Sequence, residues 1–494
     1  MTPRGHRPKG PPAGCRPDDP LAAAVAGGAH GPPAVRALTE VVLDALADGS
    51  AARGGPLPSG GPAGVAERVR AACAPVLPEA GVGARAALHG LVRAVAEGAA
   101  DPGDPACAAH LHCPPLAVAA AADLAAAVLN PSLDSWDQAP SATALEELTT
   151  AALAALVYPG AAGPDALVTS GGTESNLVAL LLARERAAAR GAGAPRVLCG
   201  TNAHHSVGRA AWLLGLAAPV PVGCRAGRMV PEALDRALRG AGGGPALVVA
   251  TAGTTDEGLI DPLPEIARVA AAHGAELHVD AAYGGPLLFS ERLAGRLRGI
   301  ESAVSVALDL HKLGWQPVAA GVLAVADGGS LRPLSLRADY LNAEDDTEAG
   351  LPDLLGRSLH TSRRPDALKI AATFRALGRA GLGALVEHCV DTAERFAECV
   401  DAHPALRRRP GAIGISTVLF RPAAADALPR AEGDALVAEI RRELLYRGRA
   451  VLGRAVAEDA DGLPRRWLKA TLLHPQAVPG DFAPLLDRIA GWGG

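Results

Sequence analysis

Short apolar segments alternate with longer segments of helical periodicity through the centre of the sequence, from about residue 116 to residue 377. The apolar segments have the length of single strands and lie at 196–199, 246–251, 276–280 and 303–308. This alternation predicts an α/β domain in which helices cover a mostly parallel sheet. Ligands of such sheets bind at the carboxyl ends of the strands, so we expect the functional residues there.

The rest of the sequence predicts three further regions. Residues 1–35 are rich in proline, glycine and alanine and predict a disordered tail. Residues 36–115 show helical spacing on both sides of a glycine- and proline-rich block and predict a helical N-terminal arm. Residues 378–494 combine helical segments with two strand-like segments and predict a small α+β domain. Residues 116–377 then form the large domain.

Composition argues against several classes of protein. A net charge of −5 gives no basic stripe for nucleic acid, and no apolar run is long enough to cross a membrane. The eight cysteines are scattered, without the spacing of a metal site or a disulfide framework. The sequence after Met1 has charges and prolines but no apolar signal segment. We therefore expect reduced cysteines, no metal and a cytoplasmic location.

An aspartate and a lysine follow two of the predicted strands. Asp280 ends the strand at 276–280, and Lys312 comes shortly after the strand at 303–308. Pyridoxal phosphate needs such a pair, because an amine holds its aldehyde as a Schiff base and a carboxylate keeps its ring nitrogen protonated. Each residue alone has an ordinary explanation, as a turn former or as a solvated loop lysine. Together they make pyridoxal phosphate the predicted cofactor.

A glycine turn offers a place for the phosphate of that cofactor. Gly171, Gly172 and Thr173 follow a short apolar strand and precede a segment of helical periodicity. Backbone N–H groups and the helix dipole favour an anion at such a turn. Glycine pairs also occur in plain turns. The segment lacks both the Walker lysine and the spaced glycines of dinucleotide sites, so nucleotide binding fits less well.

Several separated motifs give the sequence a family resemblance beyond its tail. They are Thr169-Ser-Gly-Gly-Thr-Glu-Ser-Asn, Asn202-Ala-His-His-Ser-Val, Ala250-Thr-Ala-Gly-Thr-Thr, His278-Val-Asp-Ala-Ala-Tyr-Gly and Asp309-Leu-His-Lys. In this order they resemble the group II pyridoxal-phosphate-dependent amino acid decarboxylases. The resemblance implies a fold-type I, aminotransferase-like architecture and a homodimer with shared active sites.

The resemblance also implies roles for individual residues. Lys312 binds the cofactor aldehyde and Asp280 pairs with the pyridine nitrogen, while His204 stacks on the ring. Because His205 is adjacent, the stacking residue is ambiguous by one position, and His204 also has an ordinary reading as a capping or core histidine. By the same resemblance, the residues that bind the phosphate are Gly171, Gly172, Thr173 and His311. Thr255 and Ala282 line the cofactor.

A tyrosine in a long polar segment is the expected proton donor. Tyr340 lies in a stretch that reaches about residue 355 without regular periodicity, which is typical of an active-site lid. In the family, a tyrosine on such a loop protonates the substrate carbon after carbon dioxide has left. The alternative is a tyrosine that only packs the loop base. Its presence favours a decarboxylase over an aminotransferase, which would use the same lysine and aspartate.

The substrate is predicted from two further regions. Residues 110–115 and 133–143 resemble the branch that contains the diaminobutyrate and lysine decarboxylases, which predicts a small diamino acid. Asp134 or Asp137 could pair with the substrate's second ammonium group, or could cap a helix. Leu313-Gly-Trp-Gln316 has less aromatic bulk than close relatives carry, which leaves the pocket shape open.

An acidic amino acid is the alternative substrate. Arg363 and Arg364 could bind a second carboxylate, although the family shares this tract. Such a substrate could be free or tethered to a carrier protein, in secondary metabolism.

Overall fold

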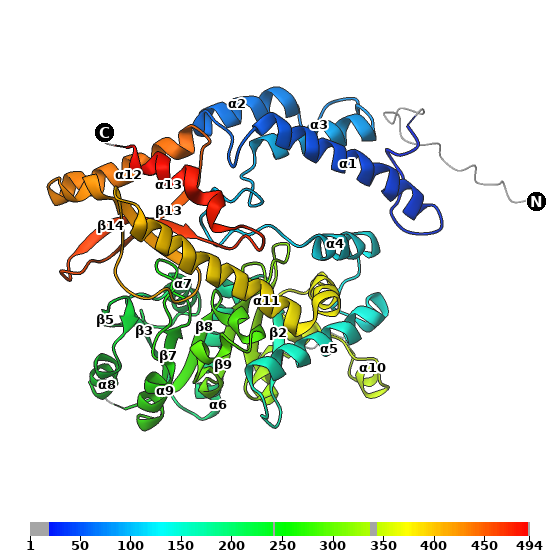
Figure 1. Ribbon diagram of the computed structural model, residues 1–494. Helices are drawn as coiled ribbons and strands as arrows, with labels where there is room; N and C mark the ends of the chain where they lie inside the picture. Colours follow the sequence, from blue (N-terminus) through cyan, green and yellow to red (C-terminus); the bar gives the residue numbers. More distant parts are fainter. Residues whose placement is uncertain (1–18, 241–242, 336–342, 493–494) are drawn as a thin grey trace, which may run out of the picture. The chain divides into compact units, whose positions relative to one another are not determined.

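The computed structural model describes residues 19–240, 243–335 and 343–492 (Figure 1). The chain divides into two compact units, Met1–Cys107 with Arg442–Val451, and Ala108–Arg441 with Leu452–Gly494. Within the described residues, none of the helices has both the length and the apolar character needed to cross a membrane. The four regions predicted from the sequence, with boundaries at 35, 115 and 377, stay a prediction.

The first unit is built from helices. They are α1 (Gly31–Arg53), α2 (Gly61–Cys73) and α3 (Ala84–Gly98). α1 and α3 approach closely at Gly49, where an added Cβ would lie 2.6 Å from the Cβ of Ala96. Arg53 ties the end of α1 to this pair of helices, because its Nη1 donates to the carbonyl of Ala96 at 2.7 Å. This unit therefore has the helical character expected of the arm.

The second unit contains a seven-stranded sheet. Its strands lie in the order β2 (Asp165–Thr169), β10 (Gly321–Val325), β9 (Ser305–Asp309), β8 (Glu276–Ala281), β7 (Ala246–Thr251), β3 (Arg196–Gly200) and β4 (Val220–Val222). β10 is antiparallel to both of its neighbours, and the other pairs are parallel. In β10, Gly321 stands opposite Thr169 on one side and Asp309 on the other. The predicted mostly parallel sheet is confirmed.

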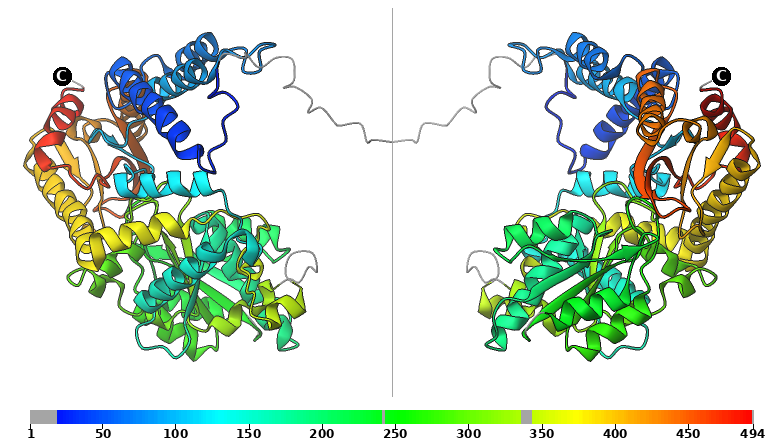
Figure 2. Two further views of the ribbon diagram at one scale, coloured as in Figure 1. Left: turned by 90° about the vertical axis from the view of Figure 1, so that its right-hand side faces the viewer. Right: turned by 90° about the vertical axis from the view of Figure 1, so that its left-hand side faces the viewer.

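Helices cover both faces of this sheet, as the two views of Figure 2 show. They are α5 (Pro140–Val157), α6 (Gly172–Ala189), α7 (Ser206–Leu213), α8 (Pro231–Arg239), α9 (Leu263–Ala272) and α11 (Ala367–Ala402). Successive residues of β7 point to opposite faces, as the pleat requires. Val248 packs in a cluster with Leu153 of α5 and Ile266 of α9, whereas Leu247 packs with Leu180 of α6. Both faces are thus apolar, which explains why the strands read as continuous hydrophobic runs.

The C-terminal part of the second unit forms an antiparallel sheet. β13 (Val451–Glu458), β14 (Pro464–Thr471), β12 (Thr417–Pro422) and β11 (Leu406–Arg408) follow one another in that order. Trp467 is fully buried at this sheet, and the guanidinium of Arg407 lies 4.8 Å from its ring centroid. Further elements are β1 (Cys107–Ala108), α4 (Ala117–Leu129), β5 (Cys224–Arg225), β6 (Arg228–Met229), α10 (Glu344–Glu348), α12 (Arg430–Tyr446) and α13 (Ala483–Ala490). The small α+β domain is confirmed in kind.

Candidate functional site

A cavity of about 350 Å³ lies at the carboxyl ends of the central strands. The β2–α6 turn, the ends of β7, β8 and β9, and the segment around His110 contribute to its wall. It is lined by all nine residues that the sequence predicts to contact the cofactor: Gly171, Gly172, Thr173, His204, Thr255, Asp280, Ala282, His311 and Lys312. Tyr340 lies outside the described residues.

Lys312 enters this cavity beside a buried carboxylate that the sequence reading missed. Lys312 Nζ lies 2.8 Å from Asp309 Oδ2, and the side chain of Asp309 is 3% exposed. Asp309 Oδ1 is buried and has no hydrogen-bond partner among the described residues. The only signal in the sequence was the spacing Asp309-Leu-His-Lys, which places Lys312 three residues after Asp309, the last residue of β9. The lysine therefore has a fixed anionic neighbour, and the cavity keeps an unused acceptor.

Asp280 is the penultimate residue of β8, which lies next to β9 in the parallel part of the sheet, so both strands place their last residues at the same edge. Asp280 is 6% exposed. Its Oδ2 accepts from Asn176 Nδ2 at 2.8 Å, and its Oδ1 accepts from the backbone N–H of Ala282 at 3.1 Å. Both contacts favour the ionised carboxylate that a protonated pyridine nitrogen needs as partner. Asn176 was missed as a functional residue, although it lies in a motif that the sequence displays.

Of the two adjacent histidines, only His204 lines the cavity that contains Lys312. His204 Nδ1 lies 2.8 Å from the hydroxyl of Ser206, at the start of α7. Burial, helped by His205, lowers the pKa of His204. The imidazole is therefore neutral near pH 7, as suits a ring that stacks on another ring.

The turn between β2 and α6 requires glycine, because a side chain at either glycine would come too close to its neighbours. A Cβ at Gly171, where φ is +153°, would lie 3.1 Å from His311 Cε1, and a Cβ at Gly172 would lie 2.9 Å from the Cβ of Ala282. α6 begins at Gly172, so its first N–H groups face outward from the helix end. His311 Nδ1 accepts from the N–H of Ala320 at 3.4 Å, which leaves Nε2 as the protonated position. These are donors for a phosphate. The residues present fit pyridoxal phosphate.

The acids predicted to meet a second substrate ammonium lie elsewhere. Asp134 is 5% exposed, and its Oδ1 accepts from Gln138 Nε2 at 2.8 Å. Asp137 is exposed on the short 3-10 helix Trp136–Gln138. Neither residue lines the cavity with Lys312. Asp134 serves local structure within this chain.

The two arginines predicted to bind an acidic substrate already have partners. Both nitrogens of the Arg363 fork contact the carboxylate of Glu146 at 2.7 Å, in a pair that is nearly fully buried. Arg364 pairs with Asp123 at 2.9 Å. Removing Arg363 from its partner would leave an uncompensated buried charge. These contacts bind the segment before α11 to α4 and α5 and offer no free cation to a substrate.

A second cavity of about 420 Å³ adjoins the first and shares His204 and Thr255 with it. Three carboxylates, those of Asp256, Glu257 and Glu458, line it, and its wall contains no lysine or arginine. Burial raises the pKa of Glu257, although the nearby Arg409 opposes the shift. Glu257 pairs with Arg409 at 2.7 Å and Asp256 with Lys469 at 3.3 Å, so Glu458 is the carboxylate of this cavity that has no cationic partner among the described residues.

A buried lysine stands close to this junction. Lys469 Nζ donates to the carbonyl of Thr255 at 2.9 Å and lies 3.3 Å from Asp256 Oδ1. Lys469 is 8% exposed and comes from β14. Nothing in the sequence pattern pointed to it, because its proximity to Thr255 depends on the packing of the small sheet against the end of β7.

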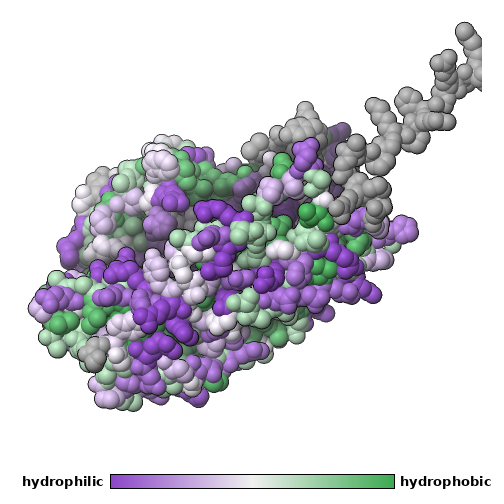
Figure 3. Space-filling view, turned by 90° about the horizontal axis from the view of Figure 1, so that it is seen from above, coloured by the Kyte–Doolittle hydropathy of each residue, from purple (hydrophilic) through white to green (hydrophobic). Residues whose placement is uncertain are grey.

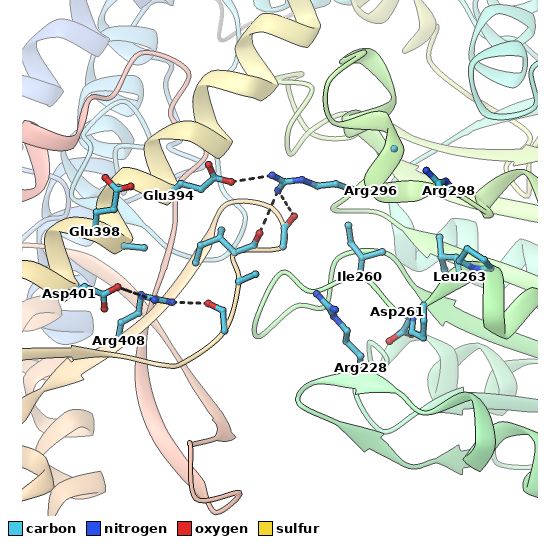
Figure 4. A pocket seen from close by; sticks show the side chains of 18 residues that line it. Arg228, Ile260, Asp261, Leu263, Arg296, Arg298, Glu394, Glu398, Asp401 and Arg408 are labelled. Carbon is cyan, nitrogen blue, oxygen red and sulfur yellow. Dashed lines mark hydrogen bonds and ion pairs between the residues drawn. The ribbon is translucent and has the colours of Figure 1, made fainter.

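A larger cavity, of about 940 Å³, lies elsewhere among the described residues (Figure 4). Ion pairs line it: Arg296 contacts Glu394 at 3.1 Å, and Arg408 contacts Asp401 at 2.9 Å. Figure 4 shows Glu394 and Asp401 on α11, with Arg296 and Arg408 as their partners. It contains none of the predicted site residues. Size alone would have misplaced the active site.

Comparisons with known proteins agree with the geometry. Residues 87–421 match the family described as pyridoxal-dependent decarboxylase conserved domain. L-2,4-diaminobutyrate decarboxylase of Rhizobium meliloti (strain 1021) is 45% identical over 420 residues, covering 84% of this chain and 83% of the relative. The enzyme of the same name from Acinetobacter baumannii is 33% identical over 410 residues, covering 77% and 78%.

Solved structures give the same result. The glutamate decarboxylase domain of diaminobutyrate-pyruvate transaminase and L-2,4-diaminobutyrate decarboxylase from Vibrio parahaemolyticus has a TM-score of 0.81 and 30% identity, covering 95% of this chain and 97% of that one. The predicted fold-type I architecture, the pyridoxal phosphate cofactor and the carboxy-lyase activity are confirmed. The chain belongs to the pyridoxal-dependent decarboxylase family.

Proposed function

We propose that the substrate is a small L-diamino acid, with L-2,4-diaminobutyrate as the first candidate. The observation that carries this choice is the carboxylate of Glu458 in the cavity beside His204 and Thr255, which suits a second ammonium group. The names of the Rhizobium and Acinetobacter relatives support the same choice. A second substrate carboxylate would meet the negative charge of Glu458 there and would be repelled.

The residues of the first cavity have complementary tasks in this proposal. Lys312 would hold the cofactor aldehyde and release it to the substrate amine, while Asp280 would keep a proton on the pyridine nitrogen. Gly171, Gly172, Thr173 and His311 hold the phosphate, His204 stacks on the ring, and Thr255 and Ala282 line it. Bound pyridoxal phosphate supplies an electron-withdrawing ring that takes up the electron pair of the breaking carbon–carbon bond. Tyr340, outside the described residues, protonates the α-carbon in this proposal.

Lys469 gives the corner of the site beside Thr255 a positive character. His110 lines the cavity, and burial lowers its pKa, with further contributions from the positive charges of Arg441 and Lys469. His110 and Leu111 adopt left-handed backbone conformations, with φ of 64° and 56°, which non-glycine residues seldom do. We propose that this corner receives the substrate's α-carboxylate, because a cation beside it orients the bond that breaks.

Carbon dioxide release tests the substrate class directly. The purified, cofactor-loaded protein is given diaminobutyrate, ornithine, lysine, glutamate and aspartate in turn, with Lys312→Ala as control. Turnover of a diamino acid that Lys312→Ala abolishes supports the proposal. Preference for glutamate or aspartate would replace it by the acidic alternative, and silence on all free amino acids would point to carrier-tethered substrates.

Substitution of Glu458 gives a second test. The carboxylate of Glu458 accepts only from the N–H of Ala226, at 3.0 Å, among the described hydrogen bonds of this side chain, so Glu458→Gln removes charge with little loss of structure. The KM for diaminobutyrate should rise several-fold, whereas Asp461→Asn, at the surface, should leave it unchanged. Equal KM values in both variants would place the second ammonium elsewhere.

We also propose a homodimer that shares its active sites. Exposed leucines and valines on α1 and α3 support it: Leu43 is 60%, Leu46 45%, Leu91 44% and Val95 63% exposed. The first unit also carries an apolar groove of about 800 Å³, lined by Leu57, Val65, Val69 and Leu445 among others. Figure 3 shows hydrophobic patches between hydrophilic ones on the face seen from above. Light scattering of the full chain measures the mass of the particle, and a monomer at micromolar concentration would exclude the dimer.

A reducing compartment such as the cytoplasm fits the thiols. Seven of the cysteines are described, and all are free. Burial raises the pKa of Cys113 to about 12 and that of Cys107 to about 11, which keeps both thiols protonated and unreactive.

A further inference from the structure

A chain of buried polar side chains lies behind Asp280. Asn176 of α6 is its centre: its Nδ2 lies 2.8 Å from Asp280 Oδ2 and 2.8 Å from Ser206 Oγ, and its Oδ1 lies 2.9 Å from His278 Nε2. His278 Nδ1 lies 2.8 Å from the hydroxyl of Ser305. Asn176 and His278 are fully buried, and Ser206 and Ser305 are 1% and 2% exposed. Bulk solvent does not reach these side chains, so their hydrogen-bond donors are expected to meet acceptors within the protein.

This requirement fixes the direction of each hydrogen bond around Asn176. An ionised Asp280 only accepts, so the amide nitrogen of Asn176 must face it, and the second N–H goes to Ser206. The amide oxygen then faces His278 and accepts its Nε2–H. His278 Nδ1 lies 2.8 Å from the hydroxyl and 3.1 Å from the backbone carbonyl of Ser305. Burial lowers the pKa of His278 to about 4, in agreement with a neutral ring.

The same reasoning continues to His204. Ser206 Oγ accepts from Asn176, so its own proton is free to go to His204 Nδ1, 2.8 Å away. The backbone N–H of Ser206 also points to that nitrogen, at 3.3 Å. Both groups are donors toward Nδ1, which therefore carries no proton. The proton of the neutral ring is on Nε2, for which no hydrogen-bond partner is found in the described part of the chain.

We propose that Asn176 is a positioning residue that governs two groups at once. It donates one N–H to Asp280 and, through Ser206, fixes His204 as the tautomer that carries its proton on Nε2. The ring edge opposite Ser206 then always presents an N–H donor and never an acceptor. The importance of this arrangement for catalysis rests on the proposed roles of Asp280 and His204, whereas the tautomer itself is a property of the cofactor-free chain.

Nuclear magnetic resonance of the apoprotein tests the tautomer. Histidine ring nitrogens are labelled with nitrogen-15, and spectra are recorded at about pH 8, where a histidine of ordinary or lowered pKa is neutral. The signals of His204 are those that disappear in His204→Gln. We expect a protonated Nε2 and an unprotonated Nδ1. A proton on Nδ1, or an equal mixture of both forms, would overturn the proposal without any bearing on whether the enzyme decarboxylates diamino acids.

Substitution then tests the part played by Asn176. In Asn176→Ala, Ser206 can turn its proton away, so the His204 signals should move toward the average of two tautomers. The affinity for pyridoxal phosphate should fall about tenfold, the effect of one hydrogen bond to a charged group. The matched control is Ser175→Ala, one residue earlier on α6. Ser175 is equally buried, but its hydroxyl bonds to that of Thr169, which is not part of the hydrogen-bond network around Asn176. The control should leave the His204 signals in place.

Two results would contradict the role of Asn176. One is a His204 spectrum that is the same in Asn176→Ala and wild type, and the other is an equal change in Ser175→Ala. Should Asn176→Ala fail to fold, Ser206→Ala tests the same link and spares the contact between Asn176 and Asp280. It should shift the His204 signals with a smaller loss of cofactor affinity, and unchanged signals would again overturn the proposal.

Discussion

Lys312 and Asp309 form an ion pair of 2.8 Å in a cavity where the carboxylate is 3% exposed. The pair holds the lysine in place before the cofactor arrives. Removing one partner of a pair with a buried member leaves an uncompensated charge. We expect Asp309→Asn to lower the free energy of unfolding of the apoprotein by about 2–3 kcal/mol. Urea denaturation measures it. Addition of Lys312→Met should recover part of the loss, and strictly additive effects would show that the two residues do not interact.

Gly172 tests the phosphate turn. A methyl group there would lie 2.9 Å from the Cβ of Ala282 and 3.3 Å from Asp309 Oδ2. We expect Gly172→Ala to weaken pyridoxal phosphate binding at least tenfold, about 1.4 kcal/mol, because the turn must shift. A fluorescence titration of the apoprotein gives the affinity. Gly208→Ala on α7, where an added Cβ meets nothing within 4 Å, is the control and should bind as wild type does.

Lys469 tests the corner proposed for the α-carboxylate. Lys469→Met removes a buried cation whose Nζ lies 2.9 Å from the carbonyl of Thr255. The KM should rise about tenfold or more, the effect of a charge-assisted hydrogen bond. Steady-state kinetics of carbon dioxide release measure it. Arg465→Met, on the same strand but paired with Asp461, should keep the wild-type KM. A fall in kcat alone would assign Lys469 to a step after substrate binding.

His278 makes stability depend on pH. Its folded-state pKa is about 4, below the ordinary value of 6.5, because the ring is buried. The unfolded chain therefore binds more protons than the folded chain between these values, and stability falls as the pH drops from about 6.5 to 4. The full effect is of order 3 kcal/mol. Denaturation of wild type and His278→Gln at several pH values should show a flatter profile in the variant, whereas His89→Gln, at an exposed site, should reproduce the wild-type slope.

The sequence predicted those site residues whose position follows from strand order. Asp280 and Lys312 come after consecutive strands of the alternating pattern, and such strands end at one edge of a parallel sheet. Gly171 and Gly172 follow a strand that is far in sequence from those that carry Asp280 and Lys312. The family motifs, and not the strand order, placed the two glycines in the same site. Their common cavity is a finding of the structure.

Other contacts had no signal in the sequence because they depend on register and packing. Asn176 meets Asp280 only through the way α6 crosses the sheet, and Lys469 meets Thr255 only through the position of β14. Arg363 shows the converse. Its residue type suits a substrate carboxylate, yet Glu146 takes both nitrogens of its fork. Chemistry can be read from residue types, whereas a partner already present in the fold cannot.

The antiparallel strand β10 acts as a spacer for the cofactor's two anchors. It separates β2, which leads to the phosphate turn, from β9, which leads to Lys312, and Gly321 stands level with the last residue of each. The anchors are thus kept two strand spacings apart, about 10 Å. A slip of β10 by one residue would shift the ends of β2 and β9 along the strand direction relative to one another, without a change in any residue that lines the cavity. β10 thus helps to set the distance between the phosphate turn and Lys312, although none of its residues lines the cavity.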